Sequence, residues 1–175
     1  MKGQSALALM MIFSSYCGLS LLLGQKREPA AVFGPALEQI QSKTRIPILL
    51  PSRLPSRIRE RDIKLAYGEV RKDGYFISLY FSEPGSNATY AAGFGGSTSV
   101  VRNLPSIRRL KLAGGRVALF SPVSCGGSCA PANLWWEQNG VQYEIQIKLP
   151  FTLTEEEQER ILVEAADLSV AASRE

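Results

Sequence analysis

Two cysteines separated by three small residues form the most reactive pair in the chain. Cys125 and Cys129 enclose Gly126, Gly127 and Ser128, and the two glycines let the backbone curl until the sulfur atoms meet. In an oxidising compartment such a pair most often forms a structural disulfide, so the sequence predicts a Cys125–Cys129 bond. Because the closed loop is short, we expect it to contribute about 2 kcal/mol at most.

The same spacing leaves two other chemistries open. A thiol–disulfide exchange centre of the thioredoxin type uses C-x-x-C at a helix N-terminus, which is one residue shorter than the spacing here. Copper(I) delivery sites with C-x-x-x-C spacing add a distant histidine, and this chain contains none. We expect a structural disulfide, no metal and no cofactor, with redox exchange and copper(I) handling as the alternatives.

The absence of histidine narrows the enzymatic chemistry further. With no His in 175 residues, the chain lacks the most frequent general base and a frequent zinc ligand. A Ser-His-Asp triad is excluded, and acid–base work would fall to carboxylates, Lys or Tyr. Glu137 and Glu144 share an expected strand face, but two solvated glutamates are the simpler interpretation. The sequence assigns no catalytic residue and favours a non-enzymatic protein.

A hairpin positions these glutamates beside two tryptophans. Asn139-Gly140 lies between two alternating segments, and this dipeptide favours a two-residue type I′ turn that fixes the register. We therefore expect Trp135 to face Glu144. Trp136 then faces Tyr143 and belongs to the core, whereas Trp135 lies on the polar face unless the Pro-rich segment or the C-terminal part of the chain covers it. The expected binding residues are Trp135, Glu137 and Glu144.

Two more glycine-containing turns predict further hairpins. Asp73-Gly74 and Gly114-Gly115 each lie between alternating apolar segments, and two-residue turns there would pair apolar residues with one another. The expected pairs are Val70 with Ile77 and Leu110 with Leu119. Residues 88–101 are expected to form one or two strands, with a bulge or turn at Gly93, Gly95 and Gly96. Together these segments predict an antiparallel sheet.

Helices at both ends complete the expected fold. Pro35 suits the first turn of a short helix, whereas the prolines of residues 46–55 favour an extended crossover or edge strand. Thr154 and Glu157 form a capping box that begins a C-terminal helix. We expect a single α+β domain over residues 33–172, in which an antiparallel meander sheet of about six strands carries the N- and C-terminal helices on one face.

The first 25 residues predict an export segment. An uncharged apolar run over residues 6–24 follows Lys2 and precedes Lys26, as in secretory signals. As a helix this run would span about 28 Å, near the thickness of a bilayer's hydrocarbon core. A cleaved signal peptide and an uncleaved anchor that contacts the membrane both remain open, and residues 26–32 are expected to be a linker. Cys17 follows the bulky Tyr16, which argues against lipidation.

The order of these features resembles a known kind of protein. The chain contains, in order, a short helix, the I-P-I-L-L-P segment, hairpins, the motif W-W-x-x-N-G-V-x-Y-x-I and an acid-capped helix. In this order of features it resembles small exported bacterial domains of unknown function. Some of those domains sit beside lipoprotein-sorting or anti-sigma-factor-like modules. The resemblance covers about residues 33–170 and implies a bacterial envelope protein without assigning catalytic residues.

Charge gives little information about partners. The net charge of +4 is mild, so we expect no nucleic-acid binding. We expect an exported protein of the periplasm or cell envelope that binds or scaffolds an unknown envelope protein or ligand. The alternative function is thiol–disulfide or copper(I) handling by Cys125 and Cys129.

Overall fold

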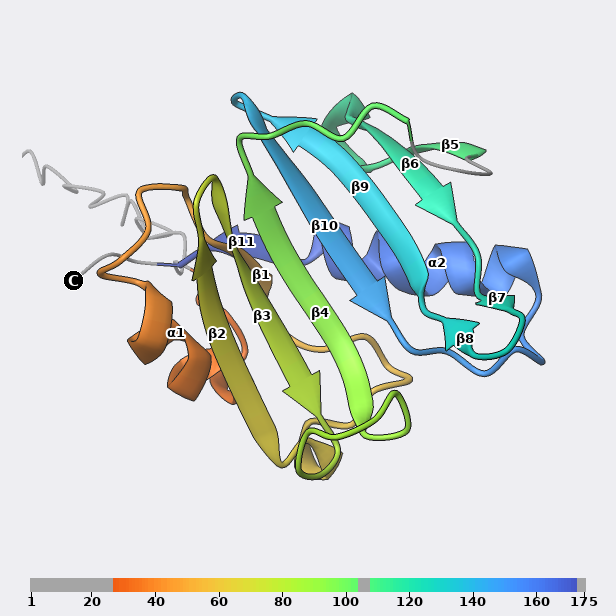
Figure 1. The fold of residues 1–175 in the computed structure, drawn as a ribbon. Coiled ribbons are helices and arrows are strands. Elements are labelled where there is room, and N and C mark those ends of the chain that lie inside the picture. The colour runs from red at the N-terminus through yellow and green to blue at the C-terminus, as the bar shows by residue number, and fades with distance from the viewer. Residues whose placement is uncertain (1–26, 104–107, 173–175) are drawn as a thin grey trace, which may run out of the picture.

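A seven-stranded antiparallel sheet forms the body of the molecule (Figure 1). The structure is a computed structural model that describes residues 27–103 and 108–172. The strand order is β2-β3-β4-β10-β9-β6-β5, so two runs of hairpins adjoin where β4 pairs with β10. The α+β class is confirmed, with seven strands where about six were expected. The strands are β2 (Leu65–Arg71), β3 (Gly74–Tyr80), β4 (Tyr90–Ser97), β5 (Arg108–Lys111), β6 (Val117–Ser121), β9 (Ala132–Gln138) and β10 (Val141–Ile147).

One face of this sheet is covered by both α-helices and by a second, two-stranded sheet (Figure 1). These elements are α1 (Gly34–Ile40), α2 (Glu155–Asp167), β1 (Leu49–Pro51) and β11 (Ser169–Ala171). α1 lies so close to β2 that a Cβ at Gly68 would be 2.5 Å from the carbonyl oxygen of Ala36. The Leu49 N–H donates to the Tyr75 hydroxyl at 3.0 Å, which ties β1 to the same face.

The hydrophobic core lies between that face and the elements that cover it. The rings of Phe33 and Phe94 pack edge to face at 5.1 Å, an arrangement that aromatic quadrupoles favour. Other side chains that are fully buried here are Ile40, Leu50, Ile77, Leu79, Phe120, Leu134, Ile145, Ile147 and Leu162. The two helices therefore stand on the apolar side of the strands, as predicted.

The Asn139-Gly140 hairpin forms in the predicted register. Asn139 has φ 52° and Gly140 has φ 75°, the positive values that a type I′ turn requires. Trp136 lies opposite Tyr143, and Trp135 lies opposite Glu144. Trp136 is only 3% exposed, and its ring stacks on that of Tyr143 with centroids 5.5 Å apart.

The C-terminal helix begins at the predicted cap. The Glu157 N–H donates to the Thr154 hydroxyl at 3.2 Å, and the Thr154 N–H donates to the Glu157 carboxylate at 2.9 Å. These two bonds satisfy backbone donors that a helix start leaves unpaired. The Pro-rich segment contains β1, an edge strand that pairs with β11, in agreement with its expected extended conformation.

The hairpin at Asp73-Gly74 has a different register from the predicted one. Arg71 pairs with Gly74, so the turn consists of Lys72 and Asp73, and Val70 lies opposite Tyr75 instead of Ile77. Gly74 belongs to β3, where a Cβ would be 2.3 Å from the carbonyl oxygen of Gly96 in β4. The glycine is therefore required by the close approach of a third strand, which local turn statistics do not include.

The prediction at Gly114-Gly115 was also wrong in register. Both glycines have positive φ, 74° and 77°, but they belong to the three-residue turn η3 (Ala113–Gly115). The extra residue places Leu110 opposite Ala118 instead of Leu119. One residue of slip exchanges the two faces of a strand, and Ala118 consequently lies in the core.

The glycines of β4 do not form a bulge or turn. Gly93, Gly95 and Gly96 pair with β3 without interruption, and the irregular step comes before them in β4, where Leu79 pairs with Ala92 and Tyr80 pairs with Tyr90. A Cβ at Gly93 would be 2.4 Å from the Phe76 ring. A Cβ at Gly95 would also be only 2.8 Å from Phe76. These positions therefore lack side chains because aromatic rings from the neighbouring strands lie over them.

The chain before α1 packs against the domain. Ala30 is buried and its N–H donates to the Pro51 carbonyl at 3.0 Å, within the stretch expected to be a linker. The expected signal or anchor over residues 1–25, including Cys17, lies outside the described residues. The remaining short elements are η1 (Ala31–Phe33), η2 (Glu60–Asp62), β7 (Ser124–Cys125) and β8 (Cys129–Ala130).

Candidate functional site

Trp135 lies on the sheet face opposite the helices. Its neighbours across the sheet are Glu144 in β10 and Leu119 in β6. Trp135 is half-buried, in contrast to the core residue Trp136 beside it. None of the helices described in the structure covers this face, which we call the open face. A large aromatic side chain there has no role in the helix-side core.

Two surface hollows lie on either side of the Trp135 indole. The larger, of about 430 Å³, lies above β3, β4 and β10, and we call it the β4 hollow. The smaller, of about 340 Å³, lies above β6 and β9, and we call it the β6 hollow. Trp135 and Gln142 line both hollows. Volumes of this size are within the range of about 300–1,000 Å³ that small-molecule sites occupy.

The three residues expected to bind a ligand are distributed over both hollows. Glu144 lines the β4 hollow, Glu137 lines the β6 hollow, and Trp135 separates them. The hairpin register therefore brings all three to the open face, with the two carboxylates on opposite sides of the indole. Arg109 also lines the β6 hollow, so both signs of charge are present there.

A network of side-chain hydrogen bonds holds Glu144 in place. The Tyr90 hydroxyl donates to Gln146 Oε1 at 3.1 Å, and Gln146 Nε2 donates to Glu144 Oε1 at 2.7 Å. Burial raises the pKa of Tyr90 well above its usual value, and the neighbouring Glu144 carboxylate raises the pKa further, as does Tyr80. Tyr90 therefore stays protonated as a donor, and the chain fixes the orientation of the carboxylate next to Trp135.

Gln142 shares the open face with Trp135, but its polar side chain is only 7% exposed. The Val101 N–H donates to Gln142 Oε1 at 3.0 Å, and Gln142 Nε2 donates to the Val101 carbonyl at 3.3 Å. The side chain thus pairs with the Val101 backbone as a neighbouring strand would. As a result, the segment after β4 crosses one end of the open face and forms one wall of the β4 hollow.

Aromatic and cationic side chains from β2 and β3 line the far side of the β4 hollow. The Arg71 guanidinium lies 4.7 Å from the centre of the Phe76 ring, a cation–π geometry, and Arg71 also pairs with Glu69 at 3.5 Å. Neither Arg71 nor Phe76 was expected at the site from the sequence. The sequence did contain one signal for this part of the site, which is Phe76. It alternates with Tyr75 and Ile77 along β3, so this aromatic residue lies on the open face and not in the core.

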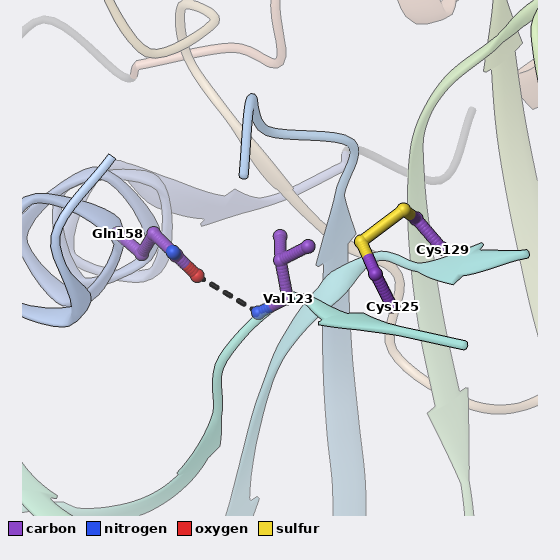
Figure 2. Close-up of a disulfide and its surroundings, with 4 residues drawn as sticks. All are labelled: Val123, Cys125, Cys129 and Gln158. Carbon is purple, nitrogen blue, oxygen red and sulfur yellow. Dashed lines mark hydrogen bonds between the residues drawn. A yellow bond between two sulfur atoms is a disulfide. The ribbon is translucent and has the colours of Figure 1, made fainter. Parts of the chain in front are cut away.

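The Cys125–Cys129 disulfide is formed, as predicted (Figure 2). The sulfur atoms are 2.08 Å apart, and the bond links β7 to β8, where Cys125 pairs with Cys129. Both cysteines are exposed. The Val123 N–H donates to Gln158 Oε1 of α2 at 2.8 Å, so the strand leading to the disulfide is tied to the C-terminal helix (Figure 2).

The described residues show neither a metal-type cluster nor a helix suited to a membrane. Residues 27–103 and 108–172 contain no cluster of three or more His, Cys, Asp or Glu side chains with the arrangement of a metal site. No helix in that part of the chain combines the length and apolarity that a bilayer-spanning helix needs. Comparison of the chain with family models, with curated proteins and with solved structures finds no match.

Proposed function

We propose that this protein is an exported, non-enzymatic binding or scaffolding domain of the bacterial cell envelope, and that it binds through the open face. One observation carries the proposal: Trp135 lies half-buried between two hollows on a face that no described helix covers. Tryptophan is the residue type most enriched at binding hot spots. The part of the indole that stays in water adds no hydrophobic stabilisation to the free domain.

The polar groups around Trp135 support a binding role. Ligand sites combine apolar walls with a few oriented polar groups, and Glu144 is oriented by Gln146 and Tyr90. The β4 hollow offers Arg71 on the opposite side from Glu144. A ligand with both apolar and polar parts would therefore contact an indole face, a fixed carboxylate and a guanidinium.

The location in the envelope rests on different evidence. The uncharged run over residues 6–24 has the composition of an export segment. The exposed Cys125–Cys129 disulfide is of a kind that persists in oxidising compartments. Both features fit the resemblance to small exported bacterial domains.

The test compares two aromatic residues of the open face. Trp135→Ala removes the proposed contact, whereas Tyr67→Ala removes a side chain that is 53% exposed and lines neither hollow. The exported protein is mixed with washed envelopes of its own cell, and the sedimented fraction is measured. We expect Trp135→Ala to weaken sedimentation roughly 30-fold, the equivalent of about 2 kcal/mol, and Tyr67→Ala to leave it unchanged. Equal binding by both variants would contradict the proposal.

Exposure of the disulfide favours a second candidate, thiol–disulfide exchange or copper(I) handling by Cys125 and Cys129. An attacking thiolate needs access to a sulfur atom, and both cysteines are exposed. The reduction potential separates the candidates: a value below about −300 mV marks a structural disulfide. A value near about −120 mV, that of a strong oxidant, would favour exchange.

A further inference from the structure

An apolar pocket lies at the end of the sheet where β3 and β10 end and β4 and β9 begin. Its volume is about 390 Å³. Its walls come from the turn before β4, from β8 and from the segment that follows β10, with Ala88, Pro131, Leu149 and Pro150 among the apolar residues. We call it the Phe151 pocket. It shares no lining residue with either hollow beside Trp135.

Two phenylalanines leave large apolar surfaces in water at this pocket. Phe151 is 75% exposed and Phe81 is 38% exposed, and both line the pocket. The backbone of Phe81 is held in place by its N–H, which donates to the Thr89 carbonyl at 2.8 Å. Exposed apolar surface beside a concavity marks an interaction site. A ligand that covered both rings would remove this surface from water.

Lys148 gives the pocket a positive charge. It is the one charged residue among the described residues that line the pocket. Its Nζ donates to the carbonyl oxygen of Asn87, which holds the ammonium beside the turn. No carboxylate in the described part of the chain forms an ion pair with it. An anionic group would therefore find a fixed cation next to an apolar cavity.

The disulfide hairpin makes one wall of the pocket rigid. Cys129 and Val123 both line the cavity. Cys129 is fixed by its bond to Cys125, and Val123 is fixed by its hydrogen bond to Gln158 (Figure 2). A preformed cavity loses less conformational entropy when it binds a ligand. This wall gives the disulfide a function beyond the small gain in stability that a short loop provides.

We propose that the Phe151 pocket binds a single-chain amphiphile with a carboxylate head group, of the fatty-acid type. The apolar chain lies in the cavity against Phe81 and Phe151, and the carboxylate accepts a hydrogen bond from Lys148. The volume is at the lower end of the range of about 300–1,000 Å³ for small-molecule sites, so it suits one chain and not the two chains of a phospholipid. The proposal is independent of the function assigned to the open face.

The experiment uses laurate that carries a photoreactive group at its chain end. The exported protein is irradiated with this probe, and the labelled peptides are identified by mass spectrometry. Two analogues with the same chain and photoreactive group, one with an amine head and one with an alcohol head, serve as matched probes. We expect laurate to label the segments that contain Ala88 and Phe151, at concentrations at which the amine does not.

Three variants test the parts of the site. Ala88→Trp, at an exposed position of the turn, fills the cavity and should abolish labelling by laurate and by the alcohol. Lys148→Gln should weaken laurate labelling roughly tenfold, about 1.4 kcal/mol, while the alcohol labels as before. Lys111→Gln, at an exposed position of β5, is the control and should change nothing. Thermal unfolding midpoints show that each variant is folded.

Three results would overturn the proposal. The first is laurate labelling that survives Ala88→Trp. The second is equal labelling by the amine and the carboxylate, which would leave Lys148 without a role. The third is binding to vesicles of anionic phospholipid without labelling by free laurate, which would make Phe151 a membrane contact instead of part of a ligand site.

Discussion

Trp135 and Trp136 are neighbours in the chain, but they lie on opposite faces of β9. Trp136 is 3% exposed and stacks on Tyr143, so Trp136→Ala should lower the free energy of unfolding by about 3–5 kcal/mol. Trp135→Ala should lower it by about 1 kcal/mol or less, as for sites outside the core. Urea unfolding of both variants measures the difference. Equal, large losses would show that Trp135 belongs to the core.

The buried tyrosines make stability depend on alkaline pH. Burial raises the pKa values of Tyr75, Tyr90 and Tyr143 above the ordinary value of 10.0. The folded state therefore holds these protons more tightly than the unfolded state, and stability that is complete below pH 10 should fall as the pH rises further. Urea unfolding between pH 8 and about 11.5 measures this loss. Tyr90→Phe should make the loss less steep, and an unchanged slope would contradict its assigned environment.

At the scale of elements, the capping box of α2 stabilises the fold locally, so its removal should lower the free energy of unfolding by a predictable amount. Thr154→Ala deletes the hydroxyl that accepts from the Glu157 N–H, and such losses cost about 1 kcal/mol. Thr152, an exposed residue of the preceding turn, provides the matched control, because Thr152→Ala removes no cap. Thermal unfolding should separate the two variants, and equal midpoints would mean that the capping box adds no stability.

The three hairpins show which local signals in the sequence are sufficient. Asn139-Gly140 gave the correct register because a type I′ turn needs only the conformations of its own two residues. Gly74 misled the prediction because its role is set by Gly96, which lies in another strand. At Gly114-Gly115 the two positive φ values were real, but the turn contains a third residue. Turn chemistry thus predicted where each hairpin lies, and the register in one of three cases.

At the scale of the whole molecule, the class of fold could be predicted and the site could be predicted only in part. Alternating strands and a capped helix define an α+β fold. The turn register then brought Trp135 to the open face beside Glu144. The β4 hollow could not be predicted, because it depends on the pairing of β4 with β10. This pairing brings Phe76 and Val101 to the same hollow as residues of β9 and β10 that are distant from them in the sequence.

Export is a proposal for the whole chain and is tested separately from the fold. The uncharged run and the flanking Lys2 and Lys26 predict that residues 1–30 direct a protein out of the cytoplasm. Fusion of this segment to a reporter that is active only outside the cytoplasm should give activity. A fusion in which Leu21 and Leu22 are replaced by arginine provides the control and should be silent. An inactive parent fusion would contradict the proposed location.

We propose that a partner in the cell envelope covers the open face around Trp135. Hydroxyl-radical footprinting tests this most directly, because it detects a covered surface whatever the chemical nature of the partner. The oxidation rate of each aromatic side chain is measured by mass spectrometry, once in the purified protein and once in intact envelopes. We predict that Trp135 is oxidised several-fold more slowly in envelopes, while Tyr67, which lines neither hollow, reacts equally in both. Equal oxidation of Trp135 in the two preparations would contradict the claim.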